Sequence, residues 1–190
     1  RDDGFDQCGL TPTSTTTDKP QLQLNYSGIA TNDAGVSAVN LDSIVCTGSQ
    51  NIQAQIVNYG TNQINSLTVN WSVNGVAQPT FNTNSLIDTL NSTAGPTFSA
   101  NLGNVNFVAG NSYNFKIWTT QPNGQADTVN VNDTLQFTAT SGLGGTFTIG
   151  GSSPDYSTIA SAISDLKLNG ICAPVVFNLR SGTYFEQVTI

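Results

Sequence analysis

The chain has 190 residues, of which 9% are charged, and its twelve acidic side chains against five basic ones give a formal net charge of −7. This acidic balance argues against nucleic acid and anionic membrane surfaces as partners. The lack of histidine excludes a histidine general base and the usual nucleophile–histidine pair. No apolar run approaches the roughly 20 residues of a membrane helix, so no membrane insertion is expected.

Residues 1–31 are irregular, and the stretch "TPTSTTTDKP" is rich in threonine and punctuated by proline, as extended linkers are. Within this segment "QLQLNY" could add one strand. We expect the segment to be a linker or the end of a preceding module.

Residues 32–140 change to short runs in which apolar and polar residues alternate, separated by Gly, Asn, Asp and Pro. The runs are "VSAVNL", "IQAQIVN", "SLTVNWSVN", "YNFKIWTT" and "TLQFTAT". About seven or eight strands in roughly 100 residues predict an all-β fold, specifically an antiparallel β-sandwich.

The clearest alternation lies in "SLTVNWSVNGVAQ". Four apolar residues fall on one face of this run, and "NG" then supplies a two-residue hairpin turn. The pattern predicts a half-buried strand whose tryptophan lies in the core. The four residues are Leu67, Val69, Trp71 and Val73.

Longer stretches carry a family resemblance. "DAGVSAVN", "CTG", "IVNYGTNQINSLTVNWSVNG" and "GNSYNFKIWTTQPNGQADTVNVNDT" resemble immunoglobulin-like modules, related to the bacterial cell-adhesion domain group, in very long surface proteins of Bacteroidota. The resemblance covers about residues 33–140 and implies an immunoglobulin-like sandwich at the cell surface. The second cysteine of the usual inter-sheet disulfide has no candidate near "YNFKIW".

The closing segment, residues 141–190, begins with a glycine-rich joint in "TSGLGG", which we expect to act as a hinge. Ile159, Ile163 and Leu166 then lie at helical spacing, with Ser157 as the cap and "NG" as the stop, so a helix is expected over 157–168. After it, "APVVFNLRSGTYFEQVTI" indicates a strand, a Ser-Gly turn and a second strand.

This order of helix, strand, "GTY" and "EQVTI" resembles the opening of right-handed parallel β-helix domains, such as pectin methylesterases and pectate-lyase-like surface proteins. The match runs from about residue 147 to residue 190. It implies that the helix covers the open end of a first coil, with its apolar residues toward Val176 and Val188. It also implies that further coils follow in a longer parent chain.

Three cysteines, Cys8, Cys46 and Cys172, lack the spacing of a metal site, and no zinc is expected. One disulfide with a spare thiol, a partner cysteine outside this sequence and three buried free thiols all stay open.

Two oxygen-rich clusters are candidate calcium sites, because hard cations prefer several converging oxygens. One cluster contains Asn32 and Asp33, and the other contains Asn130, Asn132 and Asp133. The alternative is that these residues cap turns through side-chain to backbone bonds. No cofactor is expected.

No catalytic residue is assigned. The β-helix resemblance would point to carboxylates and an arginine, but Asp155 is expected to favour a helix dipole, and Arg180 and Glu186 to point outward from a strand pair. Four aromatic residues could stack on sugars if exposed together, although strand aromatics are usually core residues. They are Tyr59, Tyr113, Trp118 and Tyr156.

Four Asp-Ser/Thr-apolar triplets match the local pattern of O-glycosylation in secreted proteins of the Bacteroidota, which the modules resemble. A sugar at each would solubilise a surface with few charges. The alternative is that each Asp starts a strand after a turn. The acceptors would be Ser43, Thr89, Thr128 and Thr134.

Together these features predict a non-catalytic module of a long, secreted cell-surface protein, serving adhesion or as a structural stalk. The alternative is an accessory region of a secreted carbohydrate-active enzyme whose β-helix catalytic part lies downstream. The expected partners are the rest of a longer chain, neighbouring surface modules and carbohydrate.

Overall fold

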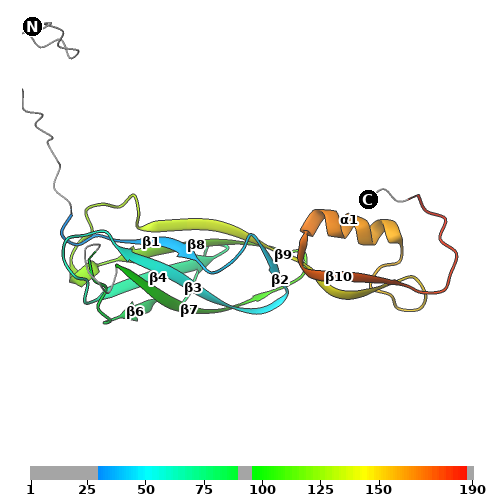
Figure 1. Cartoon of the computed structure of the whole chain (residues 1–190), viewed down its shortest axis with the longest axis horizontal. Coiled ribbons are helices and arrows are strands. Elements are labelled where there is room, and N and C mark those ends of the chain that lie inside the picture. The colour runs from blue at the N-terminus through cyan, green and yellow to red at the C-terminus, as the bar shows by residue number, and fades with distance from the viewer. Residues whose placement is uncertain (1–29, 90–95, 188–190) are drawn as a thin grey trace, which may run out of the picture.

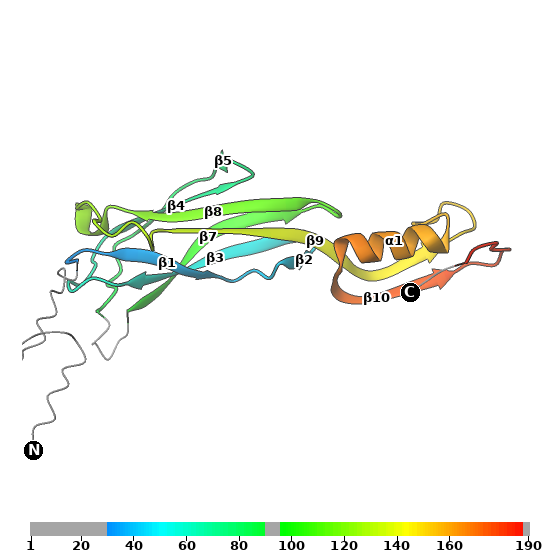
Figure 2. The same cartoon turned by 90° about the horizontal axis from the view of Figure 1, so that it is seen from above.

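The computed structural model describes residues 30–89 and 96–187. In this part of the chain an elongated β-sandwich is followed by a smaller C-terminal unit, which we define as residues 142–187 and which carries a helix (Figure 1). The two parts lie end to end. Figure 2 shows the same arrangement from above, with the start of β1 at the far end of the sandwich from the C-terminal unit.

The strands form a three-stranded sheet, β1-β3-β7, and a larger sheet, β10-β9-β8-β4-β5, in which β2 also pairs with β9 and β6 with β4. The sandwich comprises these strands except β10, which belongs to the C-terminal unit. Neighbouring strands are antiparallel, except that β2 and β10 run parallel to β9. The predicted all-β sandwich is therefore confirmed. The strand bounds are Ala34–Val39 (β1), Ile44–Cys46 (β2), Gly48–Asn58 (β3), Leu67–Val73 (β4), Val76–Ala77 (β5), Phe81–Thr83 (β6), Thr97–Phe107 (β7), Ser112–Thr120 (β8), Thr134–Ile149 (β9) and Ile171–Leu179 (β10).

Strand β7 did not stand out in the sequence because its alternation changes phase. Ala100 and Leu102 are buried before a bulge at which Gly103 adopts φ 131°, and Phe107 is buried after it. A bulge adds one residue to a strand, so the apolar residues on the two sides of it no longer share one period of two. A period-two search therefore divides this strand into two short fragments.

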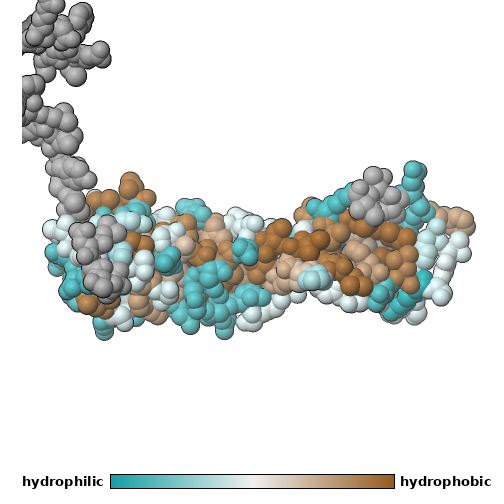
Figure 3. Space-filling model, in the orientation of Figure 1, coloured by the Kyte–Doolittle hydropathy of each residue, from teal (hydrophilic) through white to brown (hydrophobic). Residues whose placement is uncertain are grey.

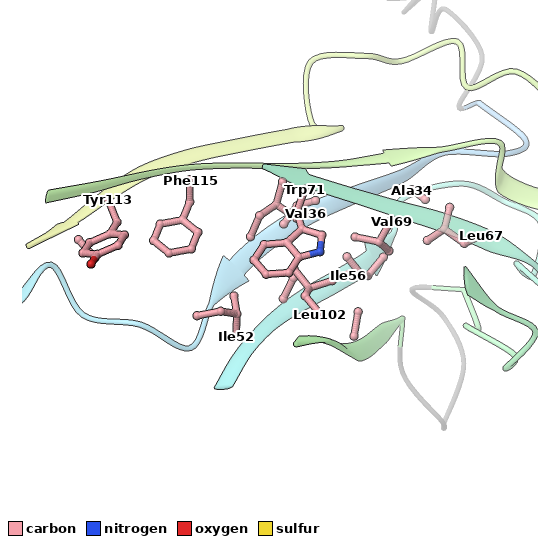
Figure 4. Close-up of a cluster of buried hydrophobic side chains, with 14 of the residues drawn as sticks. Ala34, Val36, Ile52, Ile56, Leu67, Val69, Trp71, Leu102, Tyr113 and Phe115 are labelled. Carbon is pink, nitrogen blue, oxygen red and sulfur yellow. The ribbon is translucent and has the colours of Figure 1, made fainter. Parts of the chain in front are cut away.

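The core lies between the two sheets and takes side chains from both (Figure 4). Trp71 on β4 is 2% exposed, so the prediction that it is buried is confirmed. Its indole nitrogen donates to the Pro79 carbonyl oxygen at 2.9 Å, which satisfies the polar atom of this buried ring. The predicted hairpin also forms, since Asn74 and Gly75 have φ values of 51° and 80° between β4 and β5.

Tyr113, at the start of β8, ties the β7–β8 corner to the core. Its hydroxyl accepts a hydrogen bond from the Val108 N–H at 2.8 Å and lies 3.2 Å from the Asn106 carbonyl oxygen, to which it donates. Its ring packs against Phe107 with centroids 4.5 Å apart. A tyrosine that bonds back to upstream backbone at this corner is a feature of immunoglobulin-like sandwiches.

Strand β9 belongs to both parts of the molecule. Residues 134–140 pair with β8, and the strand continues along β10 as far as Ile149. The "TSGLGG" stretch lies inside this strand, so the expectation of a hinge there is wrong. The predicted boundary between residues 140 and 141 also falls within the continuous strand.

The glycines of this stretch allow close approach of neighbouring chains. A Cβ on Gly142 would lie 2.4 Å from Ile44 Cγ2, and one on Gly144 would lie 3.0 Å from the Cys172 sulfur. Glycine is the residue that fits where backbone and side chains come this near. The glycines of the "TSGLGG" stretch therefore reflect close packing of β9 against β2 and β10.

The predicted helix forms as α1, which spans Ile159–Asn169. Thr158, and not the expected Ser157, is its N-cap, because the Thr158 side chain accepts from the Ser161 N–H at 3.0 Å. Gly170, with φ 74°, follows the last helical residue, as expected. Among the described residues, no helix is long and apolar enough to cross a membrane.

Strand β10 forms after the helix, but residues 180–187 contain no second strand, and Val188 lies outside the described residues. Val176 is 50% exposed, so the expectation that the helix packs toward it is wrong. The alternate face, with Val175 and Phe177, is the half-buried one. Phe177 contacts Tyr156 with ring centroids 5.9 Å apart, which places the small apolar core of the unit on that face.

Candidate functional site

The fold brings the two predicted calcium clusters together where β1 and β9 begin. Asn132 Nδ2 donates to Asp33 Oδ1 at 2.7 Å, across a sequence separation of 99 residues. With its amide group oriented so that both of its polar atoms find suitable partners, Asn130 donates through its side-chain nitrogen to Asp133 Oδ2 at 3.1 Å and to the Asp127 carbonyl oxygen at 3.2 Å. We call these five residues, Asp33, Asp127, Asn130, Asn132 and Asp133, the Asp/Asn cluster.

Asp127 was not among the predicted calcium-site residues, although it completes the cluster. Its carboxylate accepts from the Ala34 N–H at 2.9 Å and from the Val129 N–H at 3.0 Å. Asn32, a predicted member, lies in a separate contact and accepts from Asn123 Nδ2 at 2.9 Å. The cluster thus anchors the start of β1 to the long β8–β9 loop.

Burial and mutual repulsion set the charge state of the cluster. Asp33 is 5% exposed, and its burial raises its pKa. The hydrogen bond from Asn132 lowers this pKa, whereas the negative charge of Asp127 raises it further. Burial also raises the pKa of Asp133 to about 6, with further contributions from the charges of Asp127 and Asp33. Asn132 Oδ1 and Asp133 Oδ1 are buried without a hydrogen-bond partner among the described residues.

The arrangement does not form a ready metal centre. Within residues 30–89 and 96–187, no group of three or more cysteine, aspartate or glutamate side chains is placed to hold a metal ion. Most of the cluster's carboxylate oxygens already accept from backbone or amide N–H groups, as in turn-capping roles. Calcium binding by these residues stays a prediction.

The structure resolves which cysteines pair. Cys46, at the end of β2, forms a disulfide with Cys172 on β10, with the Cα atoms 5.2 Å apart and a sequence separation of 126. Cys8 lies outside the described residues. The alternative of three buried free thiols is wrong, and the bond joins the sandwich covalently to the C-terminal unit.

The charged residues of the C-terminal unit have structural partners. Asp155 Oδ2 accepts from the Thr148 N–H at 2.7 Å and from the Thr148 hydroxyl, and these bonds lower its pKa. Glu186 takes the position expected of Asp155: its two oxygens accept from the Ile159 and Ala160 N–H groups at the N-terminus of α1. Arg180 donates to the Ser152 carbonyl oxygen.

A polar chain inside the C-terminal unit was missed in the sequence. The Tyr156 hydroxyl donates to Asp165 Oδ2, and Asn169 Nδ2 donates to Asp165 Oδ1. Burial, followed by the adjacent Asp165 carboxylate, raises the pKa of Tyr156. Asp165 and Asn169 are four residues apart on α1, so their side chains lie on one face of the helix. This spacing is the sequence feature from which their contact could have been predicted.

The four aromatic residues considered for sugar stacking do not form one exposed platform. Tyr113 is buried at the β7–β8 corner, and Tyr156 packs against Phe147 and Phe177 in the C-terminal unit. Trp118 lies on the outer face of β8 beneath the Lys116 ammonium group, 5.0 Å from the ring centroid. Tyr59 follows the end of β3.

Three of the four glycosylation candidates, Ser43, Thr128 and Thr134, are exposed, and Thr89 is half-buried. Two of the preceding aspartates have turn contacts: Asp88 accepts from the Thr89 N–H at 2.9 Å, and Asp127 accepts from the Val129 N–H at 3.0 Å. Both interpretations of these triplets are compatible with this geometry, and modification stays a prediction.

No family model and no curated protein matches this chain. Among solved structures, the CARDB domain of a Pyrococcus furiosus protein, in complex with di-metal ions, is similar with a TM-score of 0.48 and 12% identity over 60% of this chain and 96% of that one. A domain named as part of a cell surface protein from Methanosarcina acetivorans also scores 0.48, with 16% identity over 58% of this chain and 92% of that one. At these scores the likenesses carry no inference for this chain.

Proposed function

We propose that this chain is a non-catalytic module of a long, secreted cell-surface protein, with a role in adhesion or as a structural stalk. The observation that carries the proposal is the double connection between the two parts of the molecule. Strand β9 runs unbroken from one into the other, and the Cys46–Cys172 disulfide links β2 of the sandwich to β10 of the C-terminal unit beside it. Two connections at one junction resist bending, which suits a rod that transmits force.

The disulfide also supports a location outside the cytoplasm. Structural disulfides form and persist in oxidising compartments, while cytoplasmic thiols are kept reduced. The low charge content agrees with this view, because strand faces that carry Asn, Thr and Ser stay hydrated without many ions. Glycans at the exposed Ser43, Thr128 and Thr134 would add to that hydration and belong to the same proposal.

We further propose that the C-terminal unit is the entry to a right-handed β-helix. Supporting this, α1 connects two strands that pair in parallel, β9 and β10, as successive coils of a solenoid do. Val176 and Leu179 on β10 are about half exposed. Among the described residues, β10 pairs with β9 alone, so its other edge is free to receive a further parallel strand.

Surface location can be tested on intact source cells. Brief protease treatment of the cells, followed by mass spectrometry of released peptides, is expected to yield peptides of the sandwich before any cytoplasmic marker protein appears. Peptides that appear only after the cells are lysed would contradict the proposal.

The rod itself can be tested in solution. Small-angle X-ray scattering of the oxidised chain is expected to fit one elongated rigid body. A Cys46→Ser/Cys172→Ser variant, with β9 intact, provides the matched control and is expected to show a wider distribution of shapes. Equal flexibility in the two proteins would show that the disulfide does not stiffen the junction.

A further inference from the structure

A cavity of about 290 Å³ lies where the sandwich meets the C-terminal unit, just below the usual size range of sites for drug-sized ligands. The β7–β8 corner contributes Ala109 and Gly110 to its lining, and β9 contributes Phe147. The C-terminal unit contributes Tyr156, Asp165 and Asn169. The surface around this junction is largely hydrophobic (Figure 3).

The polar side chains of the cavity include one carboxylate, Asp165, together with the Asn169 amide and the hydroxyls of Thr47 and Tyr156. Both oxygens of the Asp165 carboxylate already take one hydrogen bond, from Tyr156 and Asn169, but a carboxylate has about four acceptor positions, so further positions are open. Asn169 is 8% exposed, and its Oδ1 receives no hydrogen bond from the described residues. The Asn169 amide lies near Gly110, where a Cβ would be 3.7 Å from its Nδ2 and 4.0 Å from its Oδ1, so the amide group lies on the corner side of the cavity.

The cavity lining contains an acidic side chain but no basic one. Asp165 is the one charged residue among those that line it. The net charge of −7 on the chain adds to the local attraction for cations. The rings of Phe147 and Tyr156 line the same cavity, with their centroids 5.8 Å apart, and aromatic rings can attract a cation placed over them.

We propose that this cavity binds the primary ammonium group of a small organic cation. An ammonium group brings three N–H donors and one positive charge, which complement the acceptor oxygens and the carboxylate, while its alkyl part would contact Phe147 and Tyr156. A neutral alcohol of the same length could fill the space but would leave the carboxylate without a counter-ion.

The test is an NMR titration of the full oxidised chain with n-butylammonium chloride, with sodium chloride added to the reference to match ionic strength. We expect saturable shifts in the Asn169 side-chain amide and in the Phe147 and Tyr156 rings, with a dissociation constant on the order of millimolar. The matched ligand control is n-butanol, which is expected to shift these signals at least about tenfold more weakly.

Two variants make the outcome decisive. Asp165→Asn keeps the shape of the side chain and removes its charge, and it is expected to weaken butylammonium binding about tenfold or more. Ala109→Leu narrows the cavity from the sandwich side without touching the polar chain, and it is expected to weaken binding even if Asp165→Asn disturbs α1. Equal responses to butylammonium and butanol, unchanged binding to the Ala109→Leu variant, or no shift up to about 50 mM amine would overturn the assignment.

Discussion

The sandwich buries apolar side chains between two sheets, whereas the C-terminal unit covers one face of a two-stranded sheet with a single helix. In the sandwich, Ile52, Phe115 and Ile117 lose nearly all contact with water. In the C-terminal unit, Val176 and Leu179 stay half exposed on β10. The sandwich can therefore hold its fold through its own core, while the C-terminal unit depends on its attachments.

Those attachments differ in kind from core packing. The unit shares β9 with the sandwich and is bonded to it through Cys46–Cys172. Within the unit, Glu186 closes the N-terminus of the helix. Removing one attachment should loosen the unit and leave the sandwich folded. Removing a core residue of the sandwich should destabilise the whole chain.

The largest effect is expected from Trp71→Ala. Truncation of a large buried aromatic leaves a cavity and costs about 3–5 kcal/mol of unfolding free energy. Trp118→Ala, on the outer face of the neighbouring β8, is the matched control and is expected to cost about 1 kcal/mol. Chemical denaturation monitored by circular dichroism measures both, and similar losses in the two variants would contradict the assigned core.

The second effect is expected from the Cys46→Ser/Cys172→Ser variant. A disulfide that closes so long a loop typically stabilises by about 2–4 kcal/mol. Hydrogen exchange is expected to show faster exchange at amides of α1 and β10, with little change in β3, β4 and β8. Uniform acceleration across the sandwich would mean that the two parts unfold as one cooperative unit.

The sequence predicted best where the cause of the structure is local. The strand around Trp71 and its Asn74-Gly75 turn follow from alternation and from turn chemistry within a few residues. The "TSGLGG" stretch was misread because the groups that require glycine there, Ile44 and Cys172, lie far away in the sequence.

The same limit applies to the candidate sites. The oxygen-rich residues Asp33 and Asp133 could be picked out from composition, but their meeting depends on β1 and β9 starting side by side. Glu186 has the helix-terminal role expected of Asp155, whereas Asp155 bonds to Thr148, because nothing local indicates that the chain after β10 returns to the N-terminus of α1. The disulfide pairing likewise depended on the fold, which places β2 and β10 on the same strand, β9.

A third, smaller effect is expected from Glu186→Ala. Its carboxylate satisfies two N–H groups in the first turn of α1, and such caps contribute about 0.5–2 kcal/mol to local stability. Faster hydrogen exchange in α1 is expected, while Gln187→Ala, an exposed neighbour, should leave exchange unchanged. If both variants behave like the parent chain, Glu186 does not cap the helix in solution.

The smallest effect concerns pH and acts on the sandwich. Burial, together with the charges of Asp127 and Asp33, raises the pKa of Asp133 from 3.8 to about 6 in the folded chain. A carboxyl group whose pKa is raised by folding holds its proton more tightly in the folded state, so its contribution to stability is full below about pH 4 and is lost as the pH rises through 6. The pKa of Asp33 is also raised by folding, so Asp33 likewise lowers stability as the pH rises. With allowance for solvent screening at this partly exposed group, the free energy of unfolding is expected to be about 1 kcal/mol lower at pH 7.5 than at pH 5.

Asp155 does not oppose this trend, because its pKa is lowered and its contribution is lost only as the pH falls below the ordinary carboxyl range. Chemical denaturation at pH 5 and pH 7.5 measures the difference in the free energy of unfolding for the parent chain.

Asp133→Asn is expected to reduce this difference to the part that Asp33 contributes. Asp42→Asn, which replaces an exposed carboxylate outside the cluster, should leave the difference unchanged. Because the cluster anchors β1 to the β8–β9 loop, far from the C-terminal unit, the pH effect should appear in exchange at β1 and β9 and not in α1. A pH effect centred on α1 would place the responsible carboxylate in the C-terminal unit and would contradict the role assigned to Asp133.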